Sequence, residues 1–289
     1  MSKTEIEIGY DNKENAGKNA ISGLRSYNNW VKSVLIKRFI PQNSSVLDFC
    51  GGKGGDLRKF RHNNIKHVLL CDLSEKSIEE AKTRYSSDTL SYDFTLETIH
   101  CDCFSDELLK KIPENSQFEA VSCQFAIHYS FESEERANQA VVNLTKYLKK
   151  GGVFVGTTVN AYRVVKKLRS VPGMKFGNEH FSVDFDVDGQ THFDKQNIPI
   201  YGVKYRFDLF DAIDGIPEYL IPFCEFQKIC ERNGLKLVGF WDLHKFYGEW
   251  TKDEEYRKLF QKFSHGVFLN DKQWEIIGYY CAFVFQKVE

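Results

Sequence analysis

An acidic residue followed by a glycine-rich turn is the first feature of the sequence that could do chemistry. Within residues 46–56, the carboxylate of Asp48 precedes Cys50, Gly51 and three further glycines. Glycines let the backbone approach a nucleotide at the carboxyl edge of a parallel sheet. The dehydrogenase pattern G-x-G-x-x-G fails because Cys50 takes its first position, and the triphosphate pattern G-x-x-x-x-G-K-[ST] is absent. The turn therefore suits a ligand that presents a cationic group here rather than a phosphate.

Two further aspartates end β-rich runs. Asp72 lies about twenty residues beyond the glycines, where a carboxylate accepts both hydroxyls of a ribose. The alternative role of Asp72 is a helix N-cap, since Ser74 follows. Asp102, between Cys101 and Cys103, ends the next run and either accepts an adenine amino group or serves as a turn aspartate. With the acidic turn, these residues predict S-adenosylmethionine rather than NAD or ATP.

Short β-rich runs alternate with helical segments from residue 45 onward. The predicted strands span 45–49, 67–72, 97–102, 120–125 and 153–159, and the helices between them span about 55–62, 75–86, 104–111 and 133–149. Apolar strands separated by helices indicate a parallel sheet that is covered on both faces. The lysines and glycines of residues 149–152 predict the end of the last helix.

Segments outside this series extend the predicted architecture. The polar residues 3–20 are expected to be loosely ordered, and a helix over 24–40 ends at Pro41. Residues 170–200 break the alternation and predict an inserted lid or small hairpin layer. The remaining predicted elements are a strand over 204–210, a helix over 222–233 and two strands over 235–242 and 279–287 that complete the sheet.

Composition limits the classes of protein. A chain of 289 residues with 42% hydrophobic content suits one large α/β domain with an arm, and no apolar run approaches the ~20 residues that cross a bilayer. The eight cysteines include no C-x-x-C pair and are expected to be small buried hydrophobes in a reducing compartment. We expect no metal site and no membrane association.

The charge is balanced overall but uneven along the chain. The net charge of -1 argues against a protein that coats nucleic acid non-specifically. Residues 1–66 nevertheless carry twelve Lys and Arg against six Asp and Glu, and residues 163–169 add four bases. Such clusters fit either a short polyanion, such as a triphosphate or an RNA end, or solvated helix faces.

Four segments of the chain together resemble the eukaryotic and viral mRNA cap guanine-N7 methyltransferases. They are residues 24–36, 46–56, 122–129, and 205–207 with 216–219, and the resemblance covers about residues 10–288. It implies a Rossmann-like class I methyltransferase fold with a mostly parallel seven-stranded sheet, helices on both faces, an N-terminal helical arm and an inserted lid region. The implied division is an arm and helix over 1–44 and a methyltransferase domain over 45–289, with the insertion around 170–220.

The resemblance also implies the ligands and the residues that bind them. The residues expected to hold S-adenosyl-L-methionine are Lys32, Asp48, Cys50, Gly51, Asp72, Asp102, Cys103 and Gln124. The residues expected to bind the 5'-capped RNA are Asn28, Asn29, Lys53, Lys59, Arg84, Phe125, His128, Tyr129, Tyr205, Phe207, Glu218 and Tyr280. Glu218, His128 and Tyr280 are assigned to the reaction itself.

Particular roles follow from the same resemblance. Lys32 is expected to pair with the methionyl carboxylate of the cofactor. Cys50 stands where the family usually has glycine, which adds a thiol beside the ligand. Lys53, Lys59 and Arg84 are expected to face the cap triphosphate, with solvated surface bases as the alternative.

Glu218 has a chemical argument of its own. Guanine presents the N1-H and N2-H2 donors side by side, and one carboxylate accepts both. Guanine N7 carries an unprotonated lone pair at neutral pH, so its methylation requires no general base. Alignment of the reacting atoms is then the main contribution of the enzyme.

Two rival functions share part of this pattern. A methyltransferase acting on a small molecule or a protein would have the same loop and Asp72, but it has no need of Glu218 beside the aromatic cluster around Phe125. A catalytically silent cap-binding or stimulatory subunit has no need of Asp48 and Lys32. The expected partners are capped RNA and a capping enzyme or RNA polymerase complex, and the expected location is the nucleus, or the cytoplasm for a viral protein.

Overall fold

The computed structural model covers most of the chain. The described residues are 22–88, 91–187, 193–209, 213–266 and 268–288. The prediction that residues 3–20 are loosely ordered falls outside them.

A seven-stranded sheet forms the centre of the molecule, in the order β10-β11-β5-β4-β1-β2-β3. Its parallel strands are β1 (Ser45–Phe49), β2 (His67–Asp72), β3 (Thr95–His100), β4 (Phe118–Gln124) and β5 (Leu148–Val159). β11 (Tyr280–Lys287) runs antiparallel to both β5 and β10 (Leu235–Asp242). The predicted mostly parallel seven-stranded sheet is confirmed.

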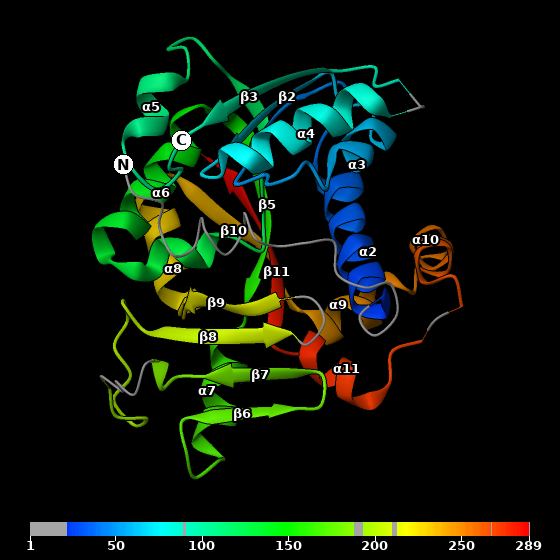
Figure 1. Cartoon of the computed structure of the whole chain (residues 1–289). Helices are drawn as coiled ribbons and strands as arrows, with labels where there is room; N and C mark the ends of the chain where they lie inside the picture. The colour runs from blue at the N-terminus through cyan, green and yellow to red at the C-terminus, as the bar shows by residue number, and fades with distance from the viewer. Residues whose placement is uncertain (1–21, 89–90, 188–192, 210–212, 267, 289) are drawn as a thin grey trace.

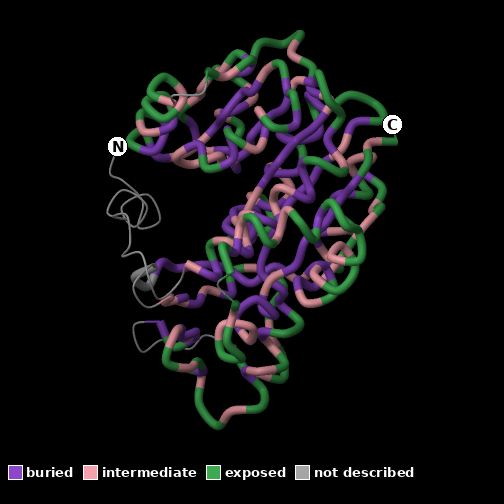
Figure 2. Tube along the Cα trace, turned by 90° about the vertical axis from the view of Figure 1, so that its right-hand side faces the viewer, coloured by how far each residue is buried: buried purple, intermediate pink, exposed green. Residues whose placement is uncertain are grey.

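Helices cover both faces of this sheet, as Figure 1 shows. On one side lie α2 (Ser22–Phe39), α3 (Leu57–His62) and α4 (Glu75–Ser87), and on the other lie α5 (Glu107–Lys111), α6 (Glu134–Lys146) and α8 (Phe223–Arg232). The buried part of the trace runs through the central strands, while exposed positions follow the outer helices and loops (Figure 2). Double coverage explains why β1, β2 and β4 read as continuous apolar runs rather than as alternating ones.

A smaller antiparallel sheet occupies the region that breaks the alternation. Its strands are β6 (Lys175–Asn178), β7 (Phe181–Asp184), β8 (Lys204–Leu209) and β9 (Ile213–Tyr219), paired in chain order. A 3-10 helix, η1 (Ile127–Glu132), follows β4 and packs against β9, and α7 (Ala161–Arg169) follows β5 and packs against β6. The small sheet is thereby attached to the end of the main sheet where β4 and β5 finish.

Three helices near the C-terminus were not predicted. α9 (Leu243–Trp250), α10 (Glu254–Ser264) and α11 (Asp271–Ile277) lie between β10 and β11 in the sequence, and α10 packs against α2. Trp30 of α2 is fully buried among aromatic rings from α9 and α10, and its indole N-H donates to the carbonyl of Tyr256 at 2.9 Å. Of these helices, α10 packs against α2, whereas α9 packs against β10 and β11.

Two predicted boundaries are wrong. Residues 149–152 do not end a helix, because α6 finishes at Lys146 and these residues belong to β5. Gly151, with φ +79°, lies beside an irregularity in the pairing of β4 with β5, so its left-handed backbone serves a bulge rather than a helix cap. The third strand ends at His100, which leaves Asp102 in the turn beyond it.

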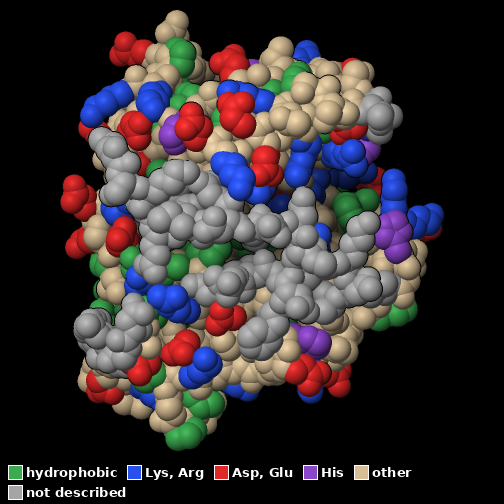
Figure 3. All heavy atoms as spheres, viewed as in Figure 1, with side chains coloured by type: hydrophobic (Ala, Val, Ile, Leu, Met, Phe, Trp, Pro, Cys, Tyr) green, Lys and Arg blue, Asp and Glu red, His purple; other side chains and the backbone are tan. Residues whose placement is uncertain are grey.

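The surface and the cysteines agree with the composition. In the part of the face that Figure 3 describes, Lys and Arg side chains are interspersed with Asp and Glu. Six cysteines are buried as predicted, whereas Cys224 is exposed and Cys50 is half-buried. Among the described helices, none has the length and apolar character to cross a membrane.

The aromatic cluster around α2 predicts a large stability effect. Trp30→Ala removes a fully buried side chain and leaves a cavity, so we expect the free energy of unfolding to fall by about 3–5 kcal/mol. Phe268→Ala is the control, because Phe268 is 82% exposed and its removal should change stability by less than about 0.5 kcal/mol. Denaturant unfolding of the two variants measures both values, and equal losses would contradict the packing role of Trp30.

Candidate active site

The glycine-rich turn lies at the carboxyl end of β1 and is held by β2. The N-H of Gly51 donates to the carbonyl of Cys71 at 3.0 Å, and the N-H of Gly52 donates to Asp72 Oδ2 at 2.8 Å. A Cβ on Gly51 would lie 2.5 Å from Asp48 Oδ2, so only glycine fits there. The backbone of this turn is therefore fixed between two carboxylates.

Asp48 is a buried carboxylate at the base of the turn. Its side chain is 2% exposed, and among the described residues its Oδ2 has no hydrogen-bond partner. Burial, followed by the nearby charge of Asp56, raises the pKa of Asp48 well above its ordinary value. A cationic ligand beside it would compensate both effects, so the site is suited to a ligand with sulfonium and ammonium groups.

Lys32, Asp56 and Lys59 form a second charged cluster at the turn. The ammonium groups of Lys32 and Lys59 lie 2.7 Å and 2.8 Å from the same oxygen, Asp56 Oδ1. Burial acts to raise the pKa of Asp56, but the two lysines outweigh it and lower that pKa well below its usual range. Two cations share one carboxylate, so this group of three retains a positive charge.

Asp72 and Asp102 occupy different settings. Ser74 caps α4, which excludes the N-cap role for Asp72, whose two oxygens accept the N-H groups of Gly52 and Ser74. Asp102 does serve as a turn aspartate, since Oδ1 accepts the N-H of Phe104 at 2.9 Å. Its carboxylate also pairs with Arg136, with Nη1 to Oδ2 at 2.9 Å.

Three other predicted cofactor residues border the same edge of the sheet. Gln124 ends β4, where its Oε1 accepts the hydroxyl of Thr157 at 3.0 Å and its Nε2 donates to Ser122. Cys103 is buried beside the Asp102 turn. Cys50 has φ +60°, a left-handed conformation that a side chain disfavours by about 1–2 kcal/mol.

A cavity of about 210 Å³ lies between the main sheet, the small sheet and the helices α2 and α11. Its lining residues are Leu24, Asn28, Phe125, His128, Tyr129, Phe207, Leu209, Ile216, Glu218, Ile276, Ile277 and Tyr280. Seven predicted RNA-binding residues therefore meet in one place. The aliphatic lining residues Leu209, Ile216, Ile276 and Ile277 were not among the predicted contacts, and α11 itself was not predicted.

Glu218 and His128 are two of the polar residues that line this cavity. Glu218 Oε1 lies 3.7 Å from His128 Nε2, and Glu218 Oε2 accepts the hydroxyl of Tyr205 at 2.5 Å. Tyr205, predicted as an aromatic contact of the base, does not line the cavity but is buried behind Glu218. His128 Nδ1 lies 3.4 Å from Thr158 Oγ1, whereas its Nε2 has no hydrogen-bond partner within the described chain.

Aromatic rings form the walls around these polar groups. The ring centroids of Phe125 and Tyr280 are 5.4 Å apart, and those of Phe207 and Tyr280 are 6.1 Å apart. Phe125 has φ +57°, a conformation rare for a bulky residue, and its N-H is held by the carbonyl and hydroxyl of Thr157. Backbone strain of this kind gathers at functional sites.

The remaining predicted RNA contacts lie outside the cavity. Asn29 is half-buried on α2. Lys53 pairs with Glu80 at 2.9 Å, and Arg84 is exposed in the last turn of α4. Lys59, expected to face the triphosphate, instead points inward to Asp56, and its side chain is only 9% exposed.

The fold and this site together define a class of protein. The chain resembles the CcbJ methyltransferase from Streptomyces caelestis, with a TM-score of 0.58 at 13% identity over 99% of this chain and 100% of the other. It also resembles an S-adenosylmethionine-dependent methyltransferase from Clostridium acetobutylicum, with a TM-score of 0.51 at 12% identity over 91% of each chain. At these identities the likeness establishes the fold, which is that of the S-adenosylmethionine-dependent methyltransferases.

The family follows from sequence comparison. A model of the mRNA (guanine-N(7))-methyltransferase domain matches residues 4–288. The mRNA cap guanine-N(7) methyltransferase 1 of Oryza sativa is 36% identical over 91% of this chain and 74% of its own length, and the Schizosaccharomyces pombe enzyme is 34% identical over 97% and 79%. The chain belongs to the mRNA (guanine-N7)-methyltransferase family. It is an S-adenosylmethionine-dependent transferase that methylates N7 of the guanosine cap of mRNA.

The backbone of Cys50 yields a prediction about stability. Glycine adopts φ +60° without strain, so Cys50→Gly should be more stable than Cys50→Ala by about 1 kcal/mol. Both variants remove the thiol, so the difference between their free energies of unfolding measures the backbone effect. Denaturant unfolding measures this difference, and an alanine variant as stable as the glycine variant would refute strain at this position.

Burial of His128 predicts a dependence of stability on pH. Burial lowers the pKa of His128 to about 3, below the ordinary value near 6.5 that holds in the unfolded chain. Below the unfolded pKa, only the unfolded state takes up the proton, so stability is lost as the pH falls. From about pH 7 to about pH 5 the loss should be about 2 kcal/mol greater for the wild type than for His128→Gln. Equal losses in denaturant unfolding would contradict a neutral, buried imidazole.

Proposed function

We propose that Glu218 recognises guanine by accepting its N1-H and N2-H2 groups, and that the cavity around Glu218 is the cap-binding site. The observation that carries this proposal is a single buried carboxylate, 7% exposed, in an aromatic cavity next to an imidazole. A carboxylate matches two adjacent donors, and guanine presents such a pair. Adenine has no N-H donor at either of these positions.

His128 complements this contact in the proposed complex. Guanine O6 is an acceptor adjacent to N1-H, so its partner must be a donor beside the carboxylate. The Nε2 of His128 lies 3.7 Å from Glu218 Oε1 and is free to donate to O6 in the tautomer that carries its proton there. Because burial lowers its pKa, the imidazole is neutral at physiological pH.

Aromatic rings are proposed to hold the plane of the base. Phe125 and Tyr280 approach the cavity from β4 and β11, and Phe207 approaches from β8. Rings at such positions stack on a base, and their faces stabilise the positive charge that guanine gains during methylation. Tyr129 and Asn28 are assigned to the edges of the nucleoside.

The glycine-rich turn is the proposed cofactor site, and S-adenosylmethionine supplies the electrophilic methyl group when it is bound. Asp48 provides buried negative charge, and the positive charge left over by Lys32, Lys59 and Asp56 suits a methionyl carboxylate. Asp72 has lone pairs beyond those used by Gly52 and Ser74 for the ribose hydroxyls. Gln124, Cys50 and Cys103 complete the proposed surroundings.

The proposed mechanism needs no general base, because guanine N7 is unprotonated. Glu218 and His128 fix the Watson-Crick edge of guanine, and the aromatic walls fix the plane of the base. N7 lies on another edge of the base and therefore faces away from Glu218. Correct alignment by itself lowers a barrier by as much as about 7–11 kcal/mol in ideal cases. As positive charge develops on the ring, N1-H becomes more acidic and its hydrogen bond to Glu218 strengthens.

We further propose that Lys53 and Arg84 bind the cap triphosphate and neutralise its charge.

The protein is proposed to work in the nucleus beside a capping enzyme or RNA polymerase. The relatives named above come from a plant and a fungus, both eukaryotes, and their names refer to mRNA caps. Imaging of the tagged chain tests the location, and exclusion from nuclei would contradict it.

Substitution of Glu218 tests the assignment of the guanine contact. Glu218→Gln replaces one acceptor oxygen with an amide donor that faces another donor, so we expect cap methylation to fall by about a hundredfold or more. The affinity for S-adenosylhomocysteine should stay unchanged, because Glu218 lies outside the glycine-rich turn. Glu119→Gln is the control, because Glu119 lies near the start of β4, at the opposite end of that strand from Gln124. Undiminished turnover in Glu218→Gln would exclude the assignment.

Substrate discrimination provides an independent measurement. Labelled S-adenosylmethionine is incubated with RNA that ends in GpppG, with RNA that ends in ApppG, and with uncapped RNA. We expect label only in the GpppG-ended RNA, because only guanine satisfies both Glu218 and His128. Equal labelling of the ApppG-ended RNA would contradict guanine recognition.

A further inference from the structure

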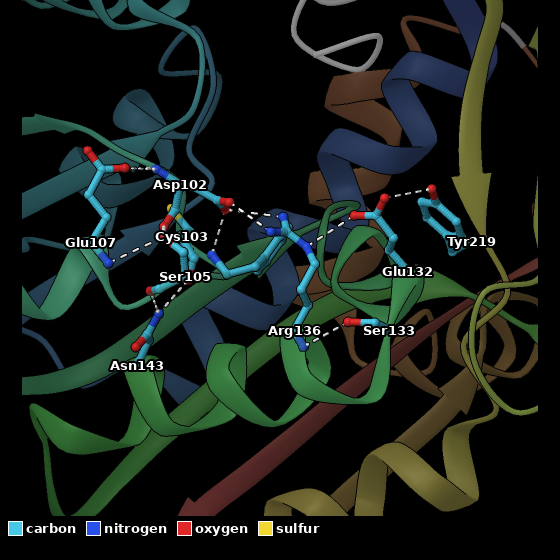
Figure 4. Close-up of polar contacts among 10 residues, drawn as sticks. Asp102, Cys103, Ser105, Glu107, Glu132, Ser133, Arg136, Asn143 and Tyr219 are labelled. Carbon is cyan, nitrogen blue, oxygen red and sulfur yellow. Dashed lines mark hydrogen bonds and ion pairs between the residues drawn. The ribbon is translucent and has the colours of Figure 1, made fainter. Parts of the chain in front are cut away.

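Arg136 lies between the cofactor side and the guanine side of the site. It stands in the first turn of α6, where its N-H donates to the capping hydroxyl of Ser133. Its guanidinium meets Asp102 through two contacts, Nη1 to Oδ2 at 2.9 Å and Nη2 to Oδ1 at 3.3 Å. On its other edge, Nε lies 3.2 Å from Glu132 Oε2, an ion-pair contact without hydrogen-bond geometry (Figure 4).

Glu132 connects this cation with the guanine site in two ways. It is the last residue of η1, the short helix that carries His128 and Tyr129. Its Oε1 accepts the hydroxyl of Tyr219 at 3.2 Å, and Tyr219 directly follows Glu218 on β9 (Figure 4). The Arg136 network, defined as Asp102, Arg136, Glu132 and Tyr219, thus joins the turn after β3 to η1 and to the small sheet.

The turn that carries Asp102 has other supports. Asn143, also on α6, donates to the carbonyls of Cys103 and Ser105 at 2.7 Å and 2.6 Å, and Glu107 accepts the N-H of Asp102 at 3.0 Å. The side chains of Arg136, Asp102 and Glu132 are 31%, 23% and 47% exposed, and ion pairs so exposed contribute little to folding stability. Loss of Arg136 should therefore leave the chain folded and the turn in place.

We infer that Arg136 is a positioning residue that couples the binding of cofactor and cap. This inference rests on the proposed roles of Asp102 at the adenine and Glu218 at the guanine. A ligand that orients the Asp102 carboxylate also orients the guanidinium, which in turn holds Glu132 and the end of η1. Binding coupled in this way is reciprocal, so each ligand raises the affinity for the other by the same factor.

The fork of the guanidinium is essential to this role. It donates two hydrogen bonds to Asp102 while its Nε edge stays within ion-pair distance of Glu132, whereas an ammonium group is a single point charge. Arg136→Lys should keep one pairing at a time, and Arg136→Gln should keep neither. Both substitutions are therefore expected to weaken the coupling, the second more than the first.

Calorimetry on the full chain tests the inference. The affinity for S-adenosylhomocysteine is measured with and without saturating GpppG, and the affinity for GpppG with and without S-adenosylhomocysteine. In the wild type we expect each ligand to tighten the other by about fivefold or more. In Arg136→Gln each ligand should still bind alone, but the coupling factor should fall to about one.

Arg58→Gln is the matched control. Arg58 also makes a two-contact ion pair with a carboxylate, at 2.8 Å and 3.3 Å to Asp88, but it lies on α3 outside the Arg136 network. Its coupling factor should equal that of the wild type.

Three results would overturn the inference. The first is no coupling in the wild type, and the second is full coupling in Arg136→Gln or Arg136→Lys. The third is that Arg136→Gln binds neither S-adenosylhomocysteine nor GpppG when each is offered alone. Failure of the underlying assignments is measured separately. It would appear as undiminished GpppG binding by Glu218→Gln or undiminished S-adenosylhomocysteine binding by Asp102→Asn, whatever Arg136 does.

Discussion

The parallel pairing of β1 with β2 on one side and β4 on the other is the constraint on which the rest of the structure depends. Parallel strands all end at the same edge, so Asp48, Asp72 and Gln124 meet there although up to 76 positions separate them. The strands are buried on both faces, so a slip by one residue would move each side chain to the opposite face, where the helices packed on the sheet would have to repack. The glycine turn can then lie between two carboxylates held by the core.

The two halves of the site differ in electrostatic character. The turn gathers buried charges, and burial together with Asp56 makes the ionised form of Asp48 unfavourable until a cation lies beside it. The guanine cavity instead is lined by one carboxylate, a neutral imidazole, the amide of Asn28, and aromatic and aliphatic side chains. The charged turn is suited to a charged ligand, and the guanine cavity is suited to a flat, neutral base. Fixed charges and dipoles in a site of low polarity need little reorganisation during the reaction.

The cavity exists only because separate layers meet. Phe125 and Tyr280 come from the main sheet, Phe207 and Glu218 from the small sheet, and Leu24 from α2. A shift of the small sheet relative to η1 would change the distance from Glu218 to His128. The Arg136 network crosses this junction and gives it a polar connection in addition to its apolar packing.

The sequence by itself determined the alternation of strands and helices, the glycine turn and the acids at the ends of β1 and β2, because these depend on local apolar patterns and on spacing. The resemblance to the cap methyltransferases singled out Glu218, and the donor pattern of guanine gave a chemical reason for that assignment. Only the tertiary structure decided that Tyr205 supports Glu218 from behind, that Lys59 points inward and that Arg136 joins Asp102 to Glu132. Arg136 and Asp102 are 34 positions apart, and no periodicity in the sequence reveals such a contact. The pairs Lys59–Asp56 and Arg136–Glu132 are local in sequence, but the direction in which each long side chain points depends on the groups that pack around it and exclude water.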